Sequence, residues 1–570
     1  MEKTIIFADE NNNNEEMKYP IGIQTFKNIR NDDFAYVDKT AHIYRLASKG
    51  KCYFLSRPRR FGKSLLLSTL NAYFQGMKEL FEGLAISKLE KNWKQYPVLH
   101  LDLNAVRYNR PEALIELLEY HLSTWEKTYG ITKESSELSI RFRNVIVCTA
   151  QQSPEKKVVV LVDEYDKPLL DAIGNPELQE AYRQILKVFY SNIKNCDEYI
   201  RFAFLTGVTK FSHLSIFSGL NNLKDISLEP RYADICGFTQ QEMETVFSEG
   251  IDDFAAAKGV SREEVLELLK TRYDGYHFSR DLSVSVYNPL SLINAFDDSA
   301  TNAYWFATGT PNFLVEVLKY CDYPLDRLTT EELTAFEMDA IDSMYSNPIP
   351  LFFQSGYLTI KDYVPEFSMY RLGFPNTEVE QGFAQFMAIY YHGGLGNGSF
   401  NIRKFVEAVR NGDAEGFMTL LQAFYADGDY QLTGKLEVYF QNSLLTIFKL
   451  MGFYVQVERH TSKGRMDVTI QTKDYIYILE LKVDKSADEA LKQISEKGYA
   501  SAFSSDPRPL FKIGVCFSSE ERELRNGELK GESFLARNQV FFYLCIFKFR
   551  RCQTVTPANA AWQALTPCRW

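Results

Sequence analysis

The sequence predicts an α/β protein in which a parallel β-sheet with a helical lid is followed by a second, smaller α/β domain. In the first part, short apolar runs suited to buried strands alternate with amphipathic helical stretches. Such alternation is typical of a parallel sheet covered by helices on both faces. The runs at 158–164 and 202–207 both end in polar residues, at the edge where such sheets bind ligands. From about residue 430, several strands follow a helix and predict the second domain.

The chain is expected to contain several domains, because 570 residues exceed what one hydrophobic core usually organises. Strand-like stretches at 350–362 and 369–374 follow a helix, so the lid is expected to contain a winged helix. The predicted segments are a disordered leader at 1–16, the first α/β domain at 17–230, the lid at 231–380, a helical connector at 381–430, the second α/β domain at 431–533 and a basic, aromatic tail at 534–570. The tail is expected to be poorly ordered, with an added strand or an interaction segment as alternatives.

Composition predicts a cytosolic protein without a membrane partner. The nine cysteines form no Cys-x-x-Cys pair and have no histidine at ligand spacing, which indicates reduced thiols. No apolar run is long enough to cross a bilayer. The net charge of −10 argues against a protein that coats nucleic acid non-specifically, although a local basic groove is compatible with it.

The densest chemical motif lies between the first buried strand and the helix that follows it. Gly62-Lys63-Ser64 opens this helix after a turn rich in proline and arginine. This context predicts the phosphate-binding loop of a P-loop NTPase, in which backbone N–H groups cradle phosphates. Lys63 would meet the β- and γ-phosphates and the Ser64 hydroxyl would bind Mg²⁺. Arg57 occupies the position of the usual first glycine, with the spacing kept. A capped helix with a surface lysine is the alternative.

Acidic residues at the end of the strand at 158–164 strengthen the prediction of a nucleotide site. Asp163 suits a Mg²⁺ ligand, and Glu164 suits a base that activates water. Thr206, at the end of a later strand, either contacts the γ-phosphate or is a plain turn residue. The predicted cofactors are ATP and Mg²⁺, and the predicted nucleotide-binding residues are Arg59, Arg60, Phe61, Gly62, Lys63, Ser64, Asp163 and Thr206.

A second set of charged residues lies in the C-terminal α/β domain. Asp467 begins one strand of a predicted hairpin, and Glu480 and Lys482 share a face of the next strand. Pairing of these strands would bring the two carboxylates together, where they could bind Mg²⁺. Lys482 would then help to orient or activate water for attack on a phosphodiester. A surface hairpin with solvated charges is the alternative reading.

These motifs together resemble a large bacterial family that pairs an AAA-ATPase-like domain with a C-terminal domain of the PD-(D/E)xK nuclease superfamily. The matching segments include residues 19–23, 36–40, 57–64, 162–166, 205–210, 353–358 and 464–482. The resemblance implies ATP binding by Lys63, Ser64 and Asp163, with Glu164 as the base, and makes Arg57 part of the family's own loop. It also implies a catalytic set of Asp467, Glu480 and Lys482, with Glu437 as an extra metal-binding acid and Gln493 as a helix glutamine.

The expected function is an ATP-binding enzyme coupled to a Mg²⁺-dependent nuclease module that cleaves DNA or RNA. The alternative is a nucleotide-dependent signalling switch whose C-terminal domain binds nucleic acid or a protein without cleaving it. A further reading keeps nucleotide binding without hydrolysis. A homo-oligomer is compatible with the sequence, which identifies no arginine that would complete a neighbour's site.

Overall fold

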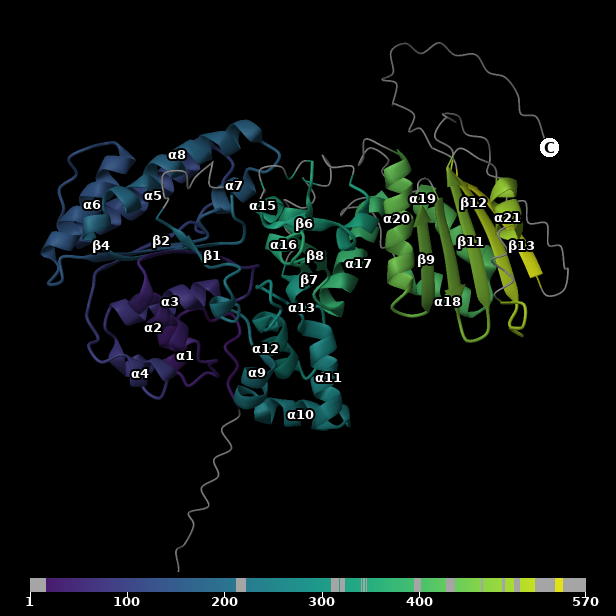
Figure 1. Cartoon of the computed structure of the whole chain (residues 1–570), viewed down its shortest axis with the longest axis horizontal. Coiled ribbons are helices and arrows are strands. Elements are labelled where there is room, and N and C mark those ends of the chain that lie inside the picture. Colours follow the sequence, from purple (N-terminus) through teal and green to yellow (C-terminus); the bar gives the residue numbers. More distant parts are fainter. Residues whose placement is uncertain are drawn as a thin grey trace, which may run out of the picture. The chain divides into compact units, whose positions relative to one another are not determined.

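The computed structural model shows a chain of two compact units (Figure 1). One unit comprises residues 1–384 and 432–434, and the other comprises residues 385–431 and 435–570. The predicted connector at 381–430 therefore falls mostly in the second unit. The structure describes residues 17–211, 222–308, 317, 323–339, 341, 344, 346–393, 401–426, 436–462, 465–483, 487–496, 503–517 and 539–546.

The first unit contains the predicted parallel sheet. Its strands lie in the order β2-β3-β4-β1-β5, and every neighbouring pair is parallel. All six residues of β3 are buried, as expected for a strand covered on both faces. The carboxyl ends of β1, β3 and β4 therefore lie next to one another. The strands are β1 (Cys52–Ser56), β2 (Val98–Asp102), β3 (Val158–Asp163), β4 (Ile200–Gly207) and β5 (Lys224–Asp225).

Helices cover both faces of this sheet (Figure 1). On one side lie α5 (Pro111–Thr128), α6 (Leu138–Gln152), α7 (Lys167–Asp171) and α8 (Pro176–Asn195). On the other side lie α1 (Phe26–Asn31), α2 (Thr40–Lys49), α3 (Lys63–Phe74) and α4 (Ala85–Leu89). Short 3-10 turns are η1 (Lys78–Phe81), η2 (Asp197–Tyr199) and η4 (Pro230–Tyr232).

A helical lid follows the sheet and has its own apolar core. Its buried residues include Met243, Phe254, Leu269 and Phe296 from successive helices. Burial of these side chains stabilises the lid because their apolar area leaves water. The helices are α9 (Gln240–Val246), α10 (Ser248–Lys258), α11 (Arg262–Tyr273), α12 (Pro289–Asp298) and α13 (Tyr304–Ala307).

The end of the first unit combines short helices with a three-stranded antiparallel sheet of order β6-β8-β7, which fits the predicted winged helix. One detail of the prediction is wrong, because residues 350–355 are helical and the strand begins only at Thr359. Pro350 lies in the first turn of this helix, where its missing N–H is not needed. The elements are η5 (Leu325–Thr329), β6 (Glu332–Thr334), α15 (Ala335–Met338), α16 (Ile349–Ser355), β7 (Thr359–Val364) and β8 (Met369–Gly373). Helix α17 (Thr377–Gly393) begins in the first unit, and its residues from 385 on belong to the second.

The second unit is built around a mixed sheet of order β13-β12-β11-β10-β9. Strands β9, β10 and β11 pair antiparallel, whereas β11, β12 and β13 pair parallel. The predicted poor order of the tail is wrong for residues 539–546, which form β13 beside β12; residues 547–570 lie outside the described part. The elements are α18 (Ile402–Arg410), α19 (Ala414–Ala426), α20 (Leu436–Met451), β9 (Gln456–Ser462), β10 (Arg465–Gln471), β11 (Ile476–Val483), α21 (Ala487–Glu496), β12 (Leu510–Phe517) and β13 (Gln539–Ile546).

Among the helices that the structure describes, none is both long enough and apolar enough to cross a lipid bilayer. The predicted leader at 1–16 lies outside the described residues.

Candidate functional site

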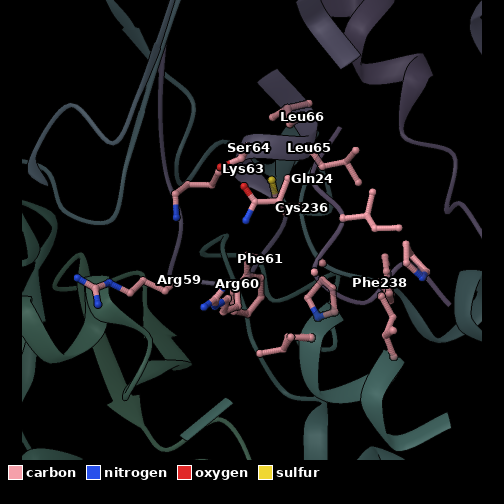
Figure 2. A pocket seen from close by; sticks show the side chains of 18 of the residues that line it. Gln24, Arg59, Arg60, Phe61, Lys63, Ser64, Leu65, Leu66, Cys236 and Phe238 are labelled. Carbon is pink, nitrogen blue, oxygen red and sulfur yellow. The ribbon is translucent and has the colours of Figure 1, made fainter. Parts of the chain in front are cut away.

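The predicted phosphate loop connects the carboxyl end of β1 to the start of α3. Gly62 precedes the first helical residue and has a φ of +91°, a left-handed conformation that glycine adopts without steric cost. Arg60 also has a positive φ of 68°. Figure 2 shows Lys63 and Ser64 at the start of α3, on the wall of a cavity. The first turn of α3, which has no side-chain cap, therefore faces a cavity with N–H groups of the kind that bind anions.

Lys63 is folded back onto its own loop. Its Nζ donates hydrogen bonds to the carbonyl oxygens of Arg57, at 2.9 Å, and Pro58, at 3.0 Å. Its side chain is buried, and burial lowers the pKa of Lys63, while the charges of Glu164 and Asp163 oppose that shift. A phosphate in the cavity would offer this ammonium group charged acceptors in place of neutral carbonyls, and such hydrogen bonds are the stronger kind.

Asp163 receives hydrogen bonds from hydroxyl groups on two different elements. Ser64 Oγ donates to one carboxylate oxygen at 2.6 Å, and Thr206 Oγ1 donates to the other at 2.7 Å. Hydroxyl and carboxylate oxygens are the hard ligands that Mg²⁺ prefers, so Ser64 and Asp163 fit the predicted cation. Thr206 is fully buried, and its hydroxyl reaches Asp163, which lines the cavity, whereas Thr206 does not. The structure thus gives Thr206 an orienting contact with Asp163.

Glu164 lines the cavity beside Lys63 and has an unusual backbone. Its φ is +51°, a left-handed conformation that is costly for a residue with a side chain. Burial raises the pKa of Glu164, with Lys63 acting in the opposite direction and Asp163 in the same direction. A carboxylate with a raised pKa holds a proton better, which suits the predicted role as a base that accepts a proton from water.

Arg57, in the place of the usual first glycine, does not line the cavity. Its guanidinium is buried and donates to the carbonyl oxygens of Ser56, Ser227 and Tyr232 at 2.9, 2.7 and 3.0 Å. It also lies 4.1 Å from the centre of the Phe278 ring. Burial lowers the pKa of Arg57 to about 10, so it remains charged at neutral pH. Arg57 therefore connects the phosphate loop to the segment after β5 and to the lid.

The other predicted loop residues divide between the cavity and the lid. Arg59, Arg60 and Phe61 line the cavity, and Phe61 also packs edge-on against Tyr276, with ring centres 4.8 Å apart. Trp305 of the lid donates its Nε1–H to the carbonyl oxygen of Arg59 at 3.1 Å. The lid therefore contacts the phosphate loop directly.

The cavity has a volume of about 460 Å³ and lies between the sheet, the N-terminal segment and the lid. This volume is in the range of sites that bind nucleotide-sized ligands. Its polar part contains Asp102, Asp163, Glu164, Lys63 and Lys167.

The cavity also has an apolar wall, on which Figure 2 shows Phe238. Other apolar residues that line it are Ile21, Ile23, Ala35, Ile235, Leu290 and Ile293. Sequence reasoning missed this apolar wall, because its residues come from three distant segments.

In the second unit, strand register places the predicted catalytic residues together. Asp467 on β10 lies directly opposite Glu480 on β11, and such residues occupy the same face of a sheet. Lys482 is two positions beyond Glu480 and shares that face. Glu480 is fully buried, and its neighbours on the strand are apolar. Two opposed carboxylate positions on one face fit a divalent cation, which would offset their mutual repulsion.

The other two predicted residues of this set lie on the helices that accompany the sheet. Glu437 lies on α20, and its side chain is outside the described part of the structure, as are those of Asp467 and Lys482. Gln493 lies on α21, next to Ile494, which packs against Ile476 and Ile478. Since Ile478 and Glu480 share a face of β11, α21 covers the face that carries the predicted catalytic residues. Among the side chains that are described, no three metal-binding residues converge.

Sequence reasoning also missed one cation on this face. Lys512 on β12 pairs with Ile478, so it occupies the same face as Glu480. It is buried, and burial lowers its pKa. Alternation along β12 is the signal that could have identified it, because a lysine occupies an inward position of an apolar strand.

Comparisons with known proteins agree with this division of the chain. Residues 20–217 match the family described as predicted AAA-ATPase, and residues 435–526 match the PD-(D/E)XK nuclease superfamily. A relative from Azotobacter chroococcum mcd 1, an uncharacterized protein in the vnfD 5′ region, is 35% identical over 522 residues. The similarity covers 89% of this chain and 98% of that protein.

Proposed function

Because this chain belongs to the family that joins a predicted AAA-ATPase domain to a C-terminal PD-(D/E)XK nuclease domain, we propose that it is an ATP hydrolase coupled to a Mg²⁺-dependent nuclease. The observation that carries the ATPase proposal is the hydrogen-bonded set of Ser64, Asp163 and Thr206 beside the start of α3. This set provides the hydroxyl and carboxylate oxygens that a nucleotide-bound Mg²⁺ requires, next to N–H groups that favour phosphate.

In the first unit, each residue has a defined task. Lys63 and the N–H groups at the start of α3 would hold the β- and γ-phosphates, while Ser64 and Asp163 would hold Mg²⁺. A bound Mg²⁺ neutralises charge on the phosphate oxygens. Glu164 accepts a proton from the attacking water, whose oxygen forms the new bond to the γ-phosphorus as the bond to the β-phosphate oxygen breaks. Arg57 is excluded from phosphate binding because its guanidinium is committed to three carbonyl oxygens.

In the second unit, Asp467 and Glu480 would hold Mg²⁺, with Glu437 as a further acid, and Lys482 would orient or activate the water that attacks a phosphodiester of DNA or RNA. The register that sets Asp467 opposite Glu480 supports this proposal over a signalling switch. Residues on opposite faces of the sheet would have favoured the switch, because they could not share a metal ion.

We place the protein in the bacterial cytoplasm. This proposal rests on the nine cysteines of the sequence, which form no Cys-x-x-Cys pair and suit a reducing compartment. A homo-oligomer in which a neighbour supplies an arginine to the cavity remains part of the proposal, and sedimentation with and without ATP would test it.

The hydrolysis proposal is tested by phosphate release from ATP with wild-type protein and Glu164→Gln. Loss of the base should reduce turnover by about 10²–10⁴-fold, with ATP binding retained because the phosphate loop is unchanged. Equal rates would remove Glu164 as the base. Absence of ATP binding by the wild-type chain would overturn the proposal for the first unit.

A further inference from the structure

The left-handed backbone at Glu164 requires structural support. A residue with a side chain is disfavoured at a φ of +51° and keeps it only when the surrounding structure imposes it. Glu164, the proposed base, lies in the short turn between β3 and α7. The contacts of the next two residues show what imposes the turn.

Tyr165 connects this turn to the end of β4. Its backbone N–H donates to the carbonyl oxygen of Thr206 at 2.9 Å. Its buried hydroxyl donates to the carbonyl oxygen of Thr209 at 3.0 Å and accepts from the N–H of Phe211 at the same distance. Both the main chain and the side chain of Tyr165 are therefore hydrogen-bonded to the segment that follows β4.

Asp166 makes a denser set of contacts with the same segment. One carboxylate oxygen accepts from Val208 N–H at 3.1 Å, and from the N–H and the hydroxyl of Thr209, both at 2.6 Å. The side chain is only 1% exposed, so these donors take the place of water. The charge of Asp166 is thus used to hold backbone N–H groups of the β4 segment.

Gly207 permits this close approach. A Cβ at Gly207 would lie 2.5 Å from Asp166 Oδ1 and 2.7 Å from the Tyr165 ring. Both distances are shorter than non-bonded atoms approach a Cβ. The segment is itself held at its far end, because Lys210 N–H donates to Gln354 Oε1 at 2.6 Å and Lys210 Nζ pairs with Asp225 at 2.7 Å. Asp166 therefore holds a segment that is fixed independently.

We propose that Asp166 is a positioning residue for ATP hydrolysis, which holds Glu164 in its left-handed turn by binding the Val208–Thr209 backbone and the Thr209 hydroxyl. The inference rests on the proposed role of Glu164 as the base. In this arrangement Asp166 does not touch the nucleotide site: it does not line the cavity, whereas Glu164 does. Its loss should affect the geometry of the base more than the binding of phosphates.

The test compares turnover and nucleotide affinity in variants of the full chain. Asp166→Asn keeps the size of the side chain but loses the charged acceptor, and turnover should fall by about 10²-fold, the scale of a misplaced catalytic group. Affinity for a non-hydrolysable ATP analogue should stay within about threefold, because Lys63 and the N–H groups of α3 are untouched.

A second pair of variants keeps the test valid if Asp166→Asn does not fold. Thr209→Val removes only the hydroxyl donor and should lower turnover about tenfold, and Thr209→Ser should restore it. Thr245→Val, at an exposed position of α9, serves as the matched control. Turnover within twofold of wild type in both Asp166→Asn and Thr209→Val, or an affinity loss that matches the turnover loss, would overturn the positioning role. A wild-type chain that binds ATP but releases no phosphate would instead refute the proposed hydrolysis and the inference with it.

Discussion

The two candidate sites are built in different ways. In the first unit, the site lies where parallel strands end, and hydrogen bonds between side chains connect the start of α3 and the segments at the ends of β3 and β4. In the second unit, the residues lie within strands, and the pairing of β10 with β11 alone brings Asp467 opposite Glu480. The first site thus depends on polar contacts between loops, whereas the second depends on strand register.

This difference predicts how each site responds to mutation. Residues of the first site hold one another, so a change at a buried polar position should alter neighbours that do not touch the ligand. Residues of the second site lie within paired strands, so removal of one side chain should abolish its own function and leave the pairing of the strands in place. The variants below should therefore differ in effect between the two sites.

The largest effect is expected for Asp467→Ala in the second unit. Loss of one of two metal-binding carboxylates should reduce cleavage of plasmid DNA or RNA by about 10³-fold, since metal-assisted catalysis supplies several kcal/mol. Lys482→Ala should have a comparable effect, and ATP turnover should be unchanged in both variants. Lys492→Ala, at an exposed position of α21, is the matched control. Cleavage at the wild-type rate by both site variants would contradict the nuclease proposal.

A smaller effect is expected for Lys63→Ala in the phosphate loop. The loss of charge-assisted hydrogen bonds to phosphate should weaken ATP binding by about 10²-fold, which corresponds to about 2–3 kcal/mol. Calorimetric titration with ATP and Mg²⁺ would measure this change, with Lys127→Ala on the exposed side of α5 as the control. An unchanged affinity would mean that the helix start binds no phosphate.

The third prediction concerns Arg57. Arg57→Met should lower the free energy of unfolding by about 2–4 kcal/mol, because three buried carbonyl oxygens lose their donor. Arg57→Gly, which restores the usual motif, should not strengthen ATP binding. Urea unfolding followed by fluorescence would measure stability, and Arg110→Met, at an exposed ion pair, should cost less than about 1 kcal/mol. A stable Arg57→Gly protein that binds ATP more tightly would refute the structural role.

The smallest effect is a pH dependence due to Glu378. Burial raises the pKa of Glu378 from 4.5 to about 7, while hydrogen bonds from Ser291 and from the N–H of Trp305 oppose the shift. The folded state therefore binds this proton more tightly than the unfolded state, and the resulting stability is lost as pH rises from about 4.5 to 7. The Tm of Glu378→Gln should fall less than that of wild type between pH 5 and pH 8. Parallel profiles would exclude Glu378 as the titrating group.

Much of the first site could be predicted from sequence, because strand ends in a parallel sheet obey simple rules. A strand, turn and helix around Gly62-Lys63-Ser64 and an acid-ended strand sufficed to bring Ser64 and Asp163 together. Thr206 was predicted either to contact the γ-phosphate or to be a plain turn residue, whereas its hydroxyl contacts Asp163. Its lack of access to the cavity depends on packing that no local pattern reveals.

Other features required the folded chain. Two of the three carbonyl partners of Arg57 lie 170 and 175 residues away in the sequence, so motif spacing could not reveal why an arginine stands in place of the usual glycine. The apolar wall of the cavity combines Ile23, Phe238 and Ile293, which only tertiary packing brings together. In the second unit, alternation within strands predicted that Glu480 and Lys482 share a face, but the exact pairing of Asp467 with Glu480 depends on register across the sheet.

The central claim is that one chain carries an ATP-hydrolysing site and a separate metal-dependent nuclease site that are coupled. Its most direct test is nucleic-acid cleavage by wild type, Glu164→Gln and Asp467→Ala, with Mg²⁺ and ATP titrated independently. We expect the wild-type protein to cleave nucleic acid only with Mg²⁺ and at a rate that changes with ATP. Cleavage should lose its response to ATP in Glu164→Gln and should disappear in Asp467→Ala. Cleavage that persists in Asp467→Ala, or that is identical at every ATP concentration, would contradict it.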